Sequence, residues 1–193
     1  MTRIIAGTVG GRTIRTPRGQ DTRPTTDRVR EALFSRVEAL LDLDGARVLD
    51  LYAGSGALGL EALSRGAAHL LAVERHRPTA RLAQDNARTL GLADRVQVEA
   101  APVAQVLRTR DAGASPPDLA YHLVLADPPY PLEEERLTEM LIALVAHGWL
   151  DPDALVVVER SARSPRPACP AGLQHLDTRT YGETSLHLAE PSG

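Results

Sequence analysis

The chain has 193 residues, the length of one α/β domain with a small addition, and 43% of them are hydrophobic, enough to bury a sizeable core. Its one cysteine, Cys169, excludes an internal disulfide, and no apolar signal run or long uncharged segment occurs, so we expect a cytoplasmic protein. The six histidines are not spaced like metal ligands, so neither a metal site nor a membrane attachment is predicted.

Positive charge is concentrated at the N-terminus. All 22 basic residues are arginine, and residues 1–36 hold eight of them against three acids, a net charge of +5. The remaining residues carry −8, because the whole chain carries −3. Arginine can bind a phosphate with two parallel hydrogen bonds, so this asymmetry favours contact between the N-terminal part and a nucleic-acid backbone.

The first predicted element is a small basic β-hairpin. Residues 3–7 and 12–15 have strand character and flank Val9-Gly10-Gly11, which contains a glycine pair typical of a tight turn. An extended linker follows, and one of the residues 25–27 can cap a helix whose apolar residues recur on one face. These apolar residues are Val29, Leu33, Val37 and Leu40.

Three arginines, Arg23, Arg28 and Arg30, crowd the start of this helix. Positive charge at that end opposes the helix dipole and costs a few tenths of a kcal/mol or more per charge. The arginines fit either a solvated helix face or a contact with phosphate, and both interpretations stay open here. We therefore divide the chain into a basic hairpin with its linker, residues 1–24, and a domain over residues 25–193.

A strand followed by a glycine-rich loop forms the centre of the pattern. The apolar run at residues 48–52 leads into Gly54, Gly56 and Gly59, which have the G-x-G-x-x-G spacing, and a helical pattern follows over residues 58–65. Because glycine has no Cβ atom, such a loop can turn sharply, approach a ligand closely and let the helix pack near the strand. The spacing alone is a weak signal: it fits a loop that binds a cofactor, and a glycine turn that binds nothing is the alternative.

Two acids near the loop indicate which cofactor it binds. Asp50 lies just before the loop, and Glu74 ends the next apolar run, where a carboxylate suits a ribose diol. A nicotinamide dinucleotide would use the same Glu74 and remains an alternative on the glycines alone. However, Asp50 would repel a pyrophosphate and attract the ammonium and sulfonium charges of S-adenosylmethionine. The acids therefore favour the methyl donor.

Strands and helices alternate through the rest of the chain. Helices are predicted over residues 78–90 and 133–146, strands over 96–98, 121–126 and 155–159, a surface loop over 111–118, and an antiparallel hairpin over 173–178 and 185–188. This alternation predicts a mostly parallel sheet covered by helices on both faces, with the hairpin at its edge. Many methyl-donor enzymes carry an acid after the third strand to bind adenine. Pro102 and Val103 stand there instead, so we expect a backbone contact near Val103.

The tetrapeptide Asp127-Pro128-Pro129-Tyr130 follows a buried strand, at the edge where open α/β sheets place ligands. The prolines fix the backbone, so its carbonyls are rigid acceptors beside the Asp127 carboxylate, and Tyr130 offers a flat face to an extruded base. Acceptors on the N–H bonds of an exocyclic amine free its lone pair to attack a methyl group. An ordinary Asp-Pro-Pro turn is the alternative, and the glycine loop upstream argues against it.

Together these segments resemble the bacterial small-subunit rRNA (guanine-N2)-methyltransferases of the RsmD type. The resemblance extends over nearly the whole chain and is carried by Arg3-Ile4-Ile5-Ala6-Gly7, Arg23-Pro24-Thr25, Asp27-Arg28-Val29-Arg30-Glu31-Ala32-Leu33-Phe34, Asp50-Leu51-Tyr52-Ala53-Gly54-Ser55-Gly56, Asp127-Pro128-Pro129-Tyr130 and Tyr181-Gly182-Glu183-Thr184. The glycine loop and the tetrapeptide recur in many methyltransferases. The arginine-rich segment, joined to the others, is specific to this family.

The resemblance implies an α/β, Rossmann-like class I S-adenosylmethionine-dependent methyltransferase with a mostly parallel seven-stranded sheet. Its substrate would be the exocyclic N2 of a guanine in 16S rRNA, either free or in the small ribosomal subunit, and a monomer is expected. The catalytic residues would be Asp127, Pro128, Pro129 and Tyr130. The cofactor would contact Asp50, Tyr52, Gly54, Ser55, Gly56, Glu74, Arg75 and Val103. RNA would contact Arg3, Arg12, Arg15, Arg23, Thr25, Arg28 and Arg30.

Other functions stay open on the residues alone. A DNA adenine-N6 methyltransferase would use the same tetrapeptide and a protein-glutamine methyltransferase a close relative of it, although both are expected to carry a larger target-recognition segment. A noncatalytic RNA-binding module with a degenerate pocket belongs to a different class, and the intact glycines, Glu74 and Asp127 argue against it. Only the whole-chain resemblance favours guanine N2 over adenine N6, because the same acceptors fit both amines.

Overall fold

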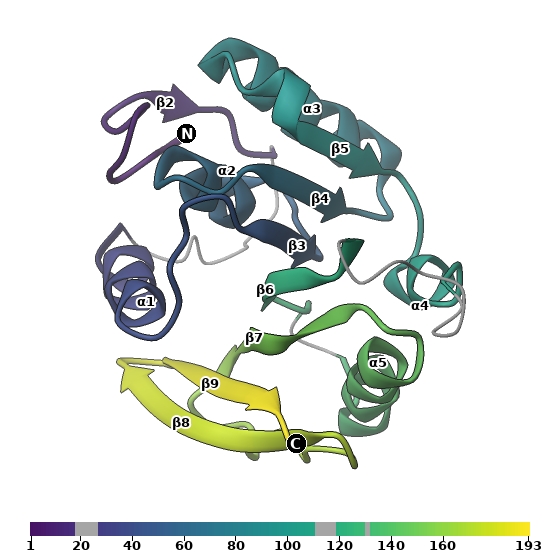
Figure 1. The fold of residues 1–193 in the computed structure, drawn as a ribbon. Coiled ribbons are helices and arrows are strands. Elements are labelled where there is room, and N and C mark those ends of the chain that lie inside the picture. The colour runs from purple at the N-terminus through teal and green to yellow at the C-terminus, as the bar shows by residue number, and fades with distance from the viewer. Residues whose placement is uncertain (18–26, 111–118, 130–131) are drawn as a thin grey trace.

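The fold is an open sheet with helices on both of its faces (Figure 1). The computed structural model describes residues 1–17, 27–110, 119–129 and 132–193. Within these residues, seven strands form one sheet in the order β5-β4-β3-β6-β7-β9-β8. The strands are β3 (Arg47–Leu51), β4 (His69–Val73), β5 (Val96–Glu99), β6 (Tyr121–Ala126), β7 (Leu150–Ser161), β8 (Leu173–Tyr181) and β9 (Thr184–Pro191).

The strand directions confirm the predicted topology. Strand β3 pairs in parallel with β4 and β6, β4 pairs in parallel with β5, and β6 pairs in parallel with β7. Strand β9 is antiparallel to both β7 and β8, which makes the C-terminal hairpin. The chain builds outward from β3 in both directions, because β4 and β6 lie on its opposite sides. Ligands of open α/β sheets bind at such a switch point, beyond the carboxyl ends of the strands.

Helices cover the two faces of the sheet unequally. They are α1 (Asp27–Glu38), α2 (Ala57–Ser64), α3 (Arg77–Leu90), α4 (Val103–Leu107) and α5 (Glu134–Ala146), with a 3-10 turn, η1, at Ala93–Arg95. Successive strand residues point to opposite faces, so Val48 belongs to one buried cluster and Leu49 to the other. Helices α1, α2 and α3 contribute to the first cluster, and α4 and α5 to the second.

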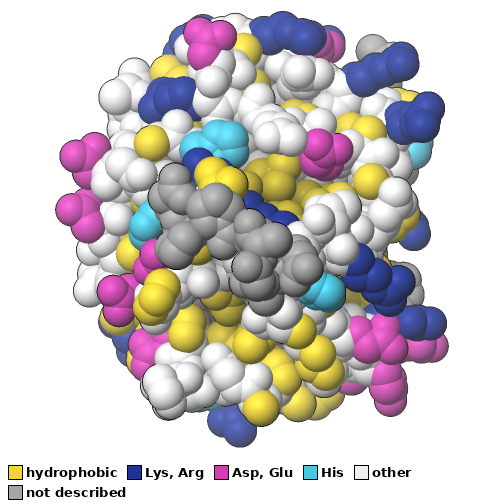
Figure 2. Space-filling view, turned by 45° about the vertical axis from the view of Figure 1, so that its right-hand side comes forward, with side chains coloured by type: hydrophobic (Ala, Val, Ile, Leu, Met, Phe, Trp, Pro, Cys, Tyr) yellow, Lys and Arg dark blue, Asp and Glu magenta, His cyan; other side chains and the backbone are white. Residues whose placement is uncertain are grey.

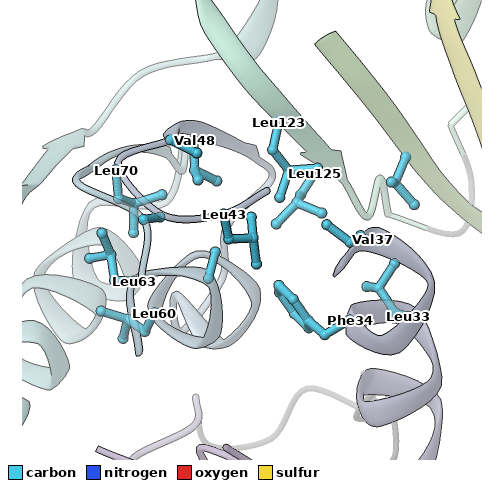
Figure 3. Packing of buried hydrophobic residues seen from close by; sticks show 14 of the residues in the cluster. Leu33, Phe34, Val37, Leu43, Val48, Leu60, Leu63, Leu70, Leu123 and Leu125 are labelled. Carbon is cyan, nitrogen blue, oxygen red and sulfur yellow. The ribbon is translucent and has the colours of Figure 1, made fainter. Parts of the chain in front are cut away.

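The first cluster fixes the helix that follows the glycine loop. Figure 3 shows Leu60 and Leu63 of α2 near Leu70 and Val48 of the sheet, with Phe34 of α1 close by. Burying a side chain of this size is worth about 1.5–3 kcal/mol, so α2 is held mainly by packing. The other labelled side chains of the cluster are Leu33, Val37, Leu43, Leu123 and Leu125.

Three local predictions differ from the structure. Helix α4 was not predicted, because five residues are too few for a helical period; Pro102 precedes it as the N-cap. Leu40 is 40% exposed and lies outside α1, because that helix ends at Glu38. Strand β7 covers twelve residues instead of the five predicted, since its polar first residues gave no strand signal.

The N-terminal segment packs against the domain. Strands β1 (Thr2–Arg3) and β2 (Thr13–Ile14) form the predicted antiparallel hairpin, although each strand is only two residues long. Ile4 and Ile14 are buried in the first cluster. Gly7 has φ +83° and lies so close to α2 that a Cβ atom would be 1.9 Å from the Ser64 carbonyl oxygen. The hairpin is therefore part of the core, and the proposed boundary after residue 24 falls outside the described residues.

A buried polar network joins this segment to α1 and α2. The Glu61 carboxylate, fully buried, accepts hydrogen bonds from the Ile5 and Ala6 N–H groups at 2.6 and 3.0 Å and from Arg65 at 2.8 Å. The Arg30 guanidinium donates to the Arg3 carbonyl at 2.7 Å and to Thr2 at 3.0 Å.

Arg30 is therefore not available to RNA. Its side chain is only 2% exposed, and it pairs with Asp27 at 2.8 Å while its Nε lies 4.0 Å from Glu61. Burial lowers the pKa of Arg30, and the charges of Glu61 and Asp27 oppose that shift. The prediction of an RNA contact for Arg30 is wrong, because charge in the sequence does not reveal a buried partner 31 positions away.

No helix in the described ranges combines the length and the apolar composition that a membrane span requires.

Candidate active site

The register of the three central strands brings the predicted acids to one edge. Leu51 at the end of β3 pairs with Val73 of β4 on one side and with Ala126 of β6 on the other. Glu74 and Asp127 are the next residues of these two strands, so they leave the sheet at the same level. Parallel pairing thus assembles carboxylates that are more than fifty residues apart in the sequence.

Asp50 lies under the glycine loop and is 1% exposed. One of its carboxylate oxygens, Oδ2, accepts a hydrogen bond of 3.0 Å from the Gly59 N–H in the first turn of α2. Burial raises the pKa of Asp50 to about 7, and the charges of Asp127 and Glu74 add to this, against the effect of the Gly59 hydrogen bond. Asp50 is therefore a carboxyl group near its titration point at neutral pH.

The backbone of the glycine loop adopts left-handed conformations that glycine favours. Gly54 and Gly56 have φ of +55° and +80°, and Tyr52 has φ +62°, a left-handed conformation that is uncommon for a non-glycine residue. A Cβ atom on Gly59 would lie 2.5 Å from Leu70. The third glycine of the motif thus permits close packing of α2 on the sheet, as predicted.

Glu74 closes the loop from the neighbouring strand. Its Oε2 accepts a hydrogen bond of 3.1 Å from the Gly54 N–H, and its Oε1 accepts one of 2.7 Å from the His76 N–H. Each carboxylate oxygen can accept a second hydrogen bond, which leaves two acceptor positions for a diol. Glu74 therefore holds the loop and can still bind a ligand.

Asp127 follows β6 directly and is exposed. The surrounding protein removes part of its hydration and raises the pKa of Asp127 to about 6. Pro128 is buried, whereas Pro129 is exposed and its carbonyl already accepts a hydrogen bond of 2.9 Å from the Leu132 N–H. The Pro129 carbonyl thus already has a hydrogen-bond partner within the loop, so the Asp127 carboxylate and the Pro128 carbonyl are better able to accept hydrogen bonds from a ligand. Tyr130 lies outside the described residues.

Arg160 is a site residue that sequence reasoning missed. It stands near the end of β7, is 8% exposed, and donates through Nη2 to the Leu132 carbonyl at 3.2 Å and to the Glu134 carboxylate. It also lies close enough to Tyr52 to lower the pKa of that phenol, which burial raises. A charged residue at the end of an apolar strand, at the edge that holds the acids, was the available signal.

The remaining predicted cofactor residues differ in their exposure. Ser55 is buried, and its carbonyl accepts a hydrogen bond of 2.9 Å from the Asn86 side chain. Arg75 is exposed beside Glu74. Val103 begins α4, and its side chain is buried in the second cluster, so only its backbone could meet a ligand.

Figure 2 shows the side of the molecule toward which β3, β4 and β5 point in Figure 1. This face is hollowed near its middle, beside the residues drawn in grey, and hydrophobic side chains line the hollow. A hollow with an apolar lining and a few convergent polar groups is the usual form of a small-molecule site.

The predicted RNA contacts have different environments. Arg3, 62% exposed, pairs with Asp27 at 2.8 Å, and Arg15, 60% exposed, pairs with Asp85 at 3.3 Å. Arg12 donates to the Leu90 carbonyl at 2.9 Å. Arg28 is exposed, and Arg23 and Thr25 lie outside the described residues.

The arrangement suits a positively charged ligand. Three carboxyl groups meet at one edge, and two of them have raised pKa values. Burial and repulsion by the other two carboxylates raise the pKa of Asp50, and partial loss of hydration raises that of Asp127. A cation placed among them would relieve that repulsion and favour their ionised forms. Across the described ranges, no three histidine, cysteine or acidic side chains are grouped to hold a metal ion.

Comparisons with known proteins agree with this fold. The family described as Conserved hypothetical protein 95 matches residues 2–190. The Escherichia coli (strain K12) protein named Ribosomal RNA small subunit methyltransferase D is 34% identical over 186 residues, which cover 96% of this chain and 88% of that protein. The solved structure of the Escherichia coli protein yhhF has a TM-score of 0.83 and 31% identity, with 100% of this chain and 98% of that chain covered.

A more distant solved structure shares the fold alone. Magnesium protoporphyrin IX methyltransferase from Synechocystis PCC 6803, solved with bound SAM, has a TM-score of 0.64 and 15% identity, covering 86% of this chain and 79% of that chain. The seven-stranded sheet, its antiparallel hairpin and these neighbours establish a Rossmann-like class I methyltransferase fold. Since the family match spans nearly the whole chain, this protein belongs to the Conserved hypothetical protein 95 family, the RsmD-type methyltransferases that its sequence resembles.

Proposed function

We propose that this chain transfers a methyl group from S-adenosylmethionine to the exocyclic N2 of a guanine in small-subunit rRNA. The observation that carries the proposal is the meeting of Asp50, Glu74 and Asp127 around the glycine loop, an anionic edge suited to a sulfonium and ammonium ligand. The substrate class, small-subunit rRNA, is taken from relatives such as the Escherichia coli protein, which is matched over 96% of this chain and 88% of its own length.

The residues around the loop fit the methyl donor. Gly54 and Gly56 leave the backbone open to close approach, Glu74 keeps acceptor positions for the ribose diol, and Asp50 keeps Oδ1 for the ammonium group. The backbone at Val103 would meet the adenine. Tyr52, Ser55 and Arg75 complete the proposed set around the pocket. Bound there, S-adenosylmethionine would supply an electrophilic methyl group.

Asp127 would orient the target amine. Its carboxylate and the Pro128 carbonyl would each accept a hydrogen bond from one N–H group of the amine. These two hydrogen bonds direct the nitrogen lone pair toward the cofactor side of the cleft. The product nitrogen loses one proton, and Asp127 would receive it; its pKa of about 6 supports this role. Tyr130 would stack on the extruded base.

Arg160 positions this loop. By donating to the Leu132 carbonyl and to Glu134, it ties the residues that follow the tetrapeptide to strand β7. A loop restrained in this way keeps its acceptors in place, and pre-organised acceptors need no rearrangement when the reaction occurs.

A DNA adenine-N6 methyltransferase is the second candidate, because the same acceptors fit adenine N6. The test is transfer of labelled methyl groups to small ribosomal subunits, naked rRNA and duplex DNA, followed by nucleoside mass spectrometry. We expect N2-methylguanosine from the ribosomal substrates and no product from DNA. Methyladenine as the sole product would refute the guanine assignment, and absence of transfer to every substrate, with the methyl donor bound, would refute the enzyme.

A further inference from the structure

Helix α3 presents a row of arginines to solvent. Arg77, Arg81 and Arg88 are four and seven positions apart, so they lie on one face of the helix, and all three are exposed. The first and last are separated by about 16 Å along the helix axis at a rise of about 1.5 Å per residue. This row was not among the RNA contacts expected from the sequence.

Two of these guanidinium groups have no partner in the described part of the chain. Arg77 and Arg81 make neither a hydrogen bond nor an ion pair there. Asp85 is the one acid of α3, and it is shared between Arg88 at 2.9 Å and Arg15 at 3.3 Å. Like charges at positions i and i+4 destabilise a helix slightly, as does an arginine in its first turn. A polyanion would remove both costs.

The N-terminal segment extends the row past the end of the helix. Arg12 donates to the Leu90 carbonyl at 2.9 Å and to the Thr89 carbonyl, so its guanidinium lies at the C-terminus of α3. Arg15 lies beside Asp85. We name the group of Arg12, Arg15, Arg77, Arg81 and Arg88 the α3 ridge.

The ridge contrasts with the rest of the molecule. Its five arginines and Asp85 together carry a net charge of +4. The whole chain carries −3, so the residues outside the ridge carry −7. A phosphate backbone would therefore be attracted to the ridge and repelled by the rest of the surface. Figure 2 shows arginine side chains along the upper part of the face that carries the hollow, at the level of α3 in Figure 1.

The ridge begins at the cofactor site. Arg77 is three residues after Glu74, whose carboxylate holds the glycine loop, and the exposed Arg75 lies between them. An RNA strand bound along α3 would therefore reach the mouth of the cleft at one end of the helix and the N-terminal hairpin at the other.

We propose that the α3 ridge is the surface that binds the RNA backbone next to the target nucleotide. This inference rests on the proposed function and assigns the main phosphate contacts to α3, with the N-terminal hairpin as the extension of the same surface. Guanidinium groups bind phosphate oxygens in pairs of hydrogen bonds, and binding releases the counterions of the RNA.

The test compares two triple variants with the same change in charge. Arg77→Ala, Arg81→Ala and Arg88→Ala remove the helical part of the ridge. Arg108→Ala, Arg136→Ala and Arg179→Ala remove three exposed arginines, one directly after α4, one in α5 and one in β8, and two of these pair with acids. Binding of a small-subunit rRNA fragment is measured over a series of salt concentrations, with methyl-donor affinity and thermal unfolding measured alongside.

The ridge variant should bind the RNA at least about tenfold more weakly. Each phosphate contact in a single strand contributes about −0.7 to the slope of log affinity against log salt concentration, so losing three contacts should make this slope shallower by about 2. Its KM for RNA should rise while kcat at saturating RNA, methyl-donor affinity and unfolding stay near wild type. The control variant should keep the wild-type affinity and slope.

Wild-type RNA affinity and slope in the ridge variant would overturn the inference, as would an equal loss in the control variant. These results differ from a failure of the proposed function, which would appear as no methyl transfer to rRNA by the wild-type protein. A ridge variant that binds RNA normally but loses kcat would also overturn the assignment, since the arginines would then act on the reaction.

Discussion

The side-chain amide of Asn86 donates a hydrogen bond of 2.9 Å to the backbone carbonyl of Ser55 in the glycine loop. The same side chain accepts from the Arg15 N–H at 3.0 Å and donates to the Arg15 carbonyl at 2.9 Å. Asn86 is 1% exposed, so one buried amide ties the N-terminal segment and the cofactor loop to α3. The two ligand sites proposed above therefore share a support.

Replacing Asn86 by alanine should weaken methyl-donor binding. The Ser55 carbonyl and both backbone groups of Arg15 would lose their partner, and an unmade hydrogen bond to a buried group costs about 1–3 kcal/mol. Calorimetry should show a roughly five- to hundredfold higher Kd for the methyl donor. Asp85→Ala is the matched control, since it removes the adjacent ion pairs without touching Ser55. Equal affinity in Asn86→Ala and wild type would show that the loop holds its shape without this support.

Removing Glu61 should destabilise the whole fold. Its carboxylate is fully buried and accepts from the Ile5 and Ala6 N–H groups and from Arg65. Glu61→Ala therefore leaves both N–H groups without a partner and Arg65 with Glu38 as its remaining ion-pair partner. Breaking a buried ion pair in this way costs about 3–5 kcal/mol. Urea unfolding should show the loss. Glu38→Ala, which removes an exposed partner of Arg65, should change the free energy of unfolding by less than about 1 kcal/mol.

The fold was predictable because its signals are local. Gly91 ends α3 with φ +76°, and the apolar runs of β3, β4 and β6 have the length of buried strands. Glu74 could be placed in the site because it follows such a run. Parallel strands share one carboxyl edge, so an acid at the end of one meets an acid at the end of the next.

The missed features depend on contacts between distant residues. Arg30 has the sequence context of a surface arginine, and only Glu61 on another helix explains its burial. Asn86 is one polar residue in an amphipathic helix and gives no local sign that it reaches two other segments. Deleting residues 1–15 would also remove Ile4 and Ile14 from the core, so such a truncation tests stability rather than RNA binding.

Asp50→Asn should stabilise the free protein at alkaline pH while weakening methyl-donor binding. The pKa of Asp50 is raised to about 7, so the folded state keeps a proton that the unfolded state loses near pH 4. The unfolding free energy of the wild type should thus fall as pH rises from about 4 to about 7, and the neutral amide should remove this part of the dependence. Thermal unfolding at about pH 5 and about pH 8 measures it. No gain in Tm at the higher pH would contradict the assigned shift.

Methyl-donor affinity should rise with pH. A cationic ligand contacts the ionised Asp50 carboxylate, and its charge also favours the ionised form of the nearby Asp127. Binding therefore releases protons that Asp50 holds up to about pH 7 and Asp127 up to about pH 6. One coupled proton changes the affinity by up to about tenfold per pH unit below the pKa. Calorimetry in two buffers of different ionisation enthalpy should detect the released protons. A pH-independent Kd between about pH 5 and about pH 8 would remove the carboxylates from the ligand contact.

Asp127→Ala should abolish most turnover and leave the methyl donor bound. The Asp127 carboxylate accepts from the amine that attacks, and this contact matters chiefly as the reaction proceeds, so kcat should fall more than affinity. Asp153→Ala removes an exposed carboxylate near the start of β7 and should retain wild-type turnover. Tyr130→Phe should be mild and Tyr130→Ala severe, since stacking on a base is worth about 1–3 kcal/mol and needs only the ring. Single-turnover methyl transfer with prebound rRNA separates these effects from binding. Near-normal turnover in Asp127→Ala would exclude this carboxylate as the acceptor, and the Pro128 carbonyl alone would then have to orient the amine.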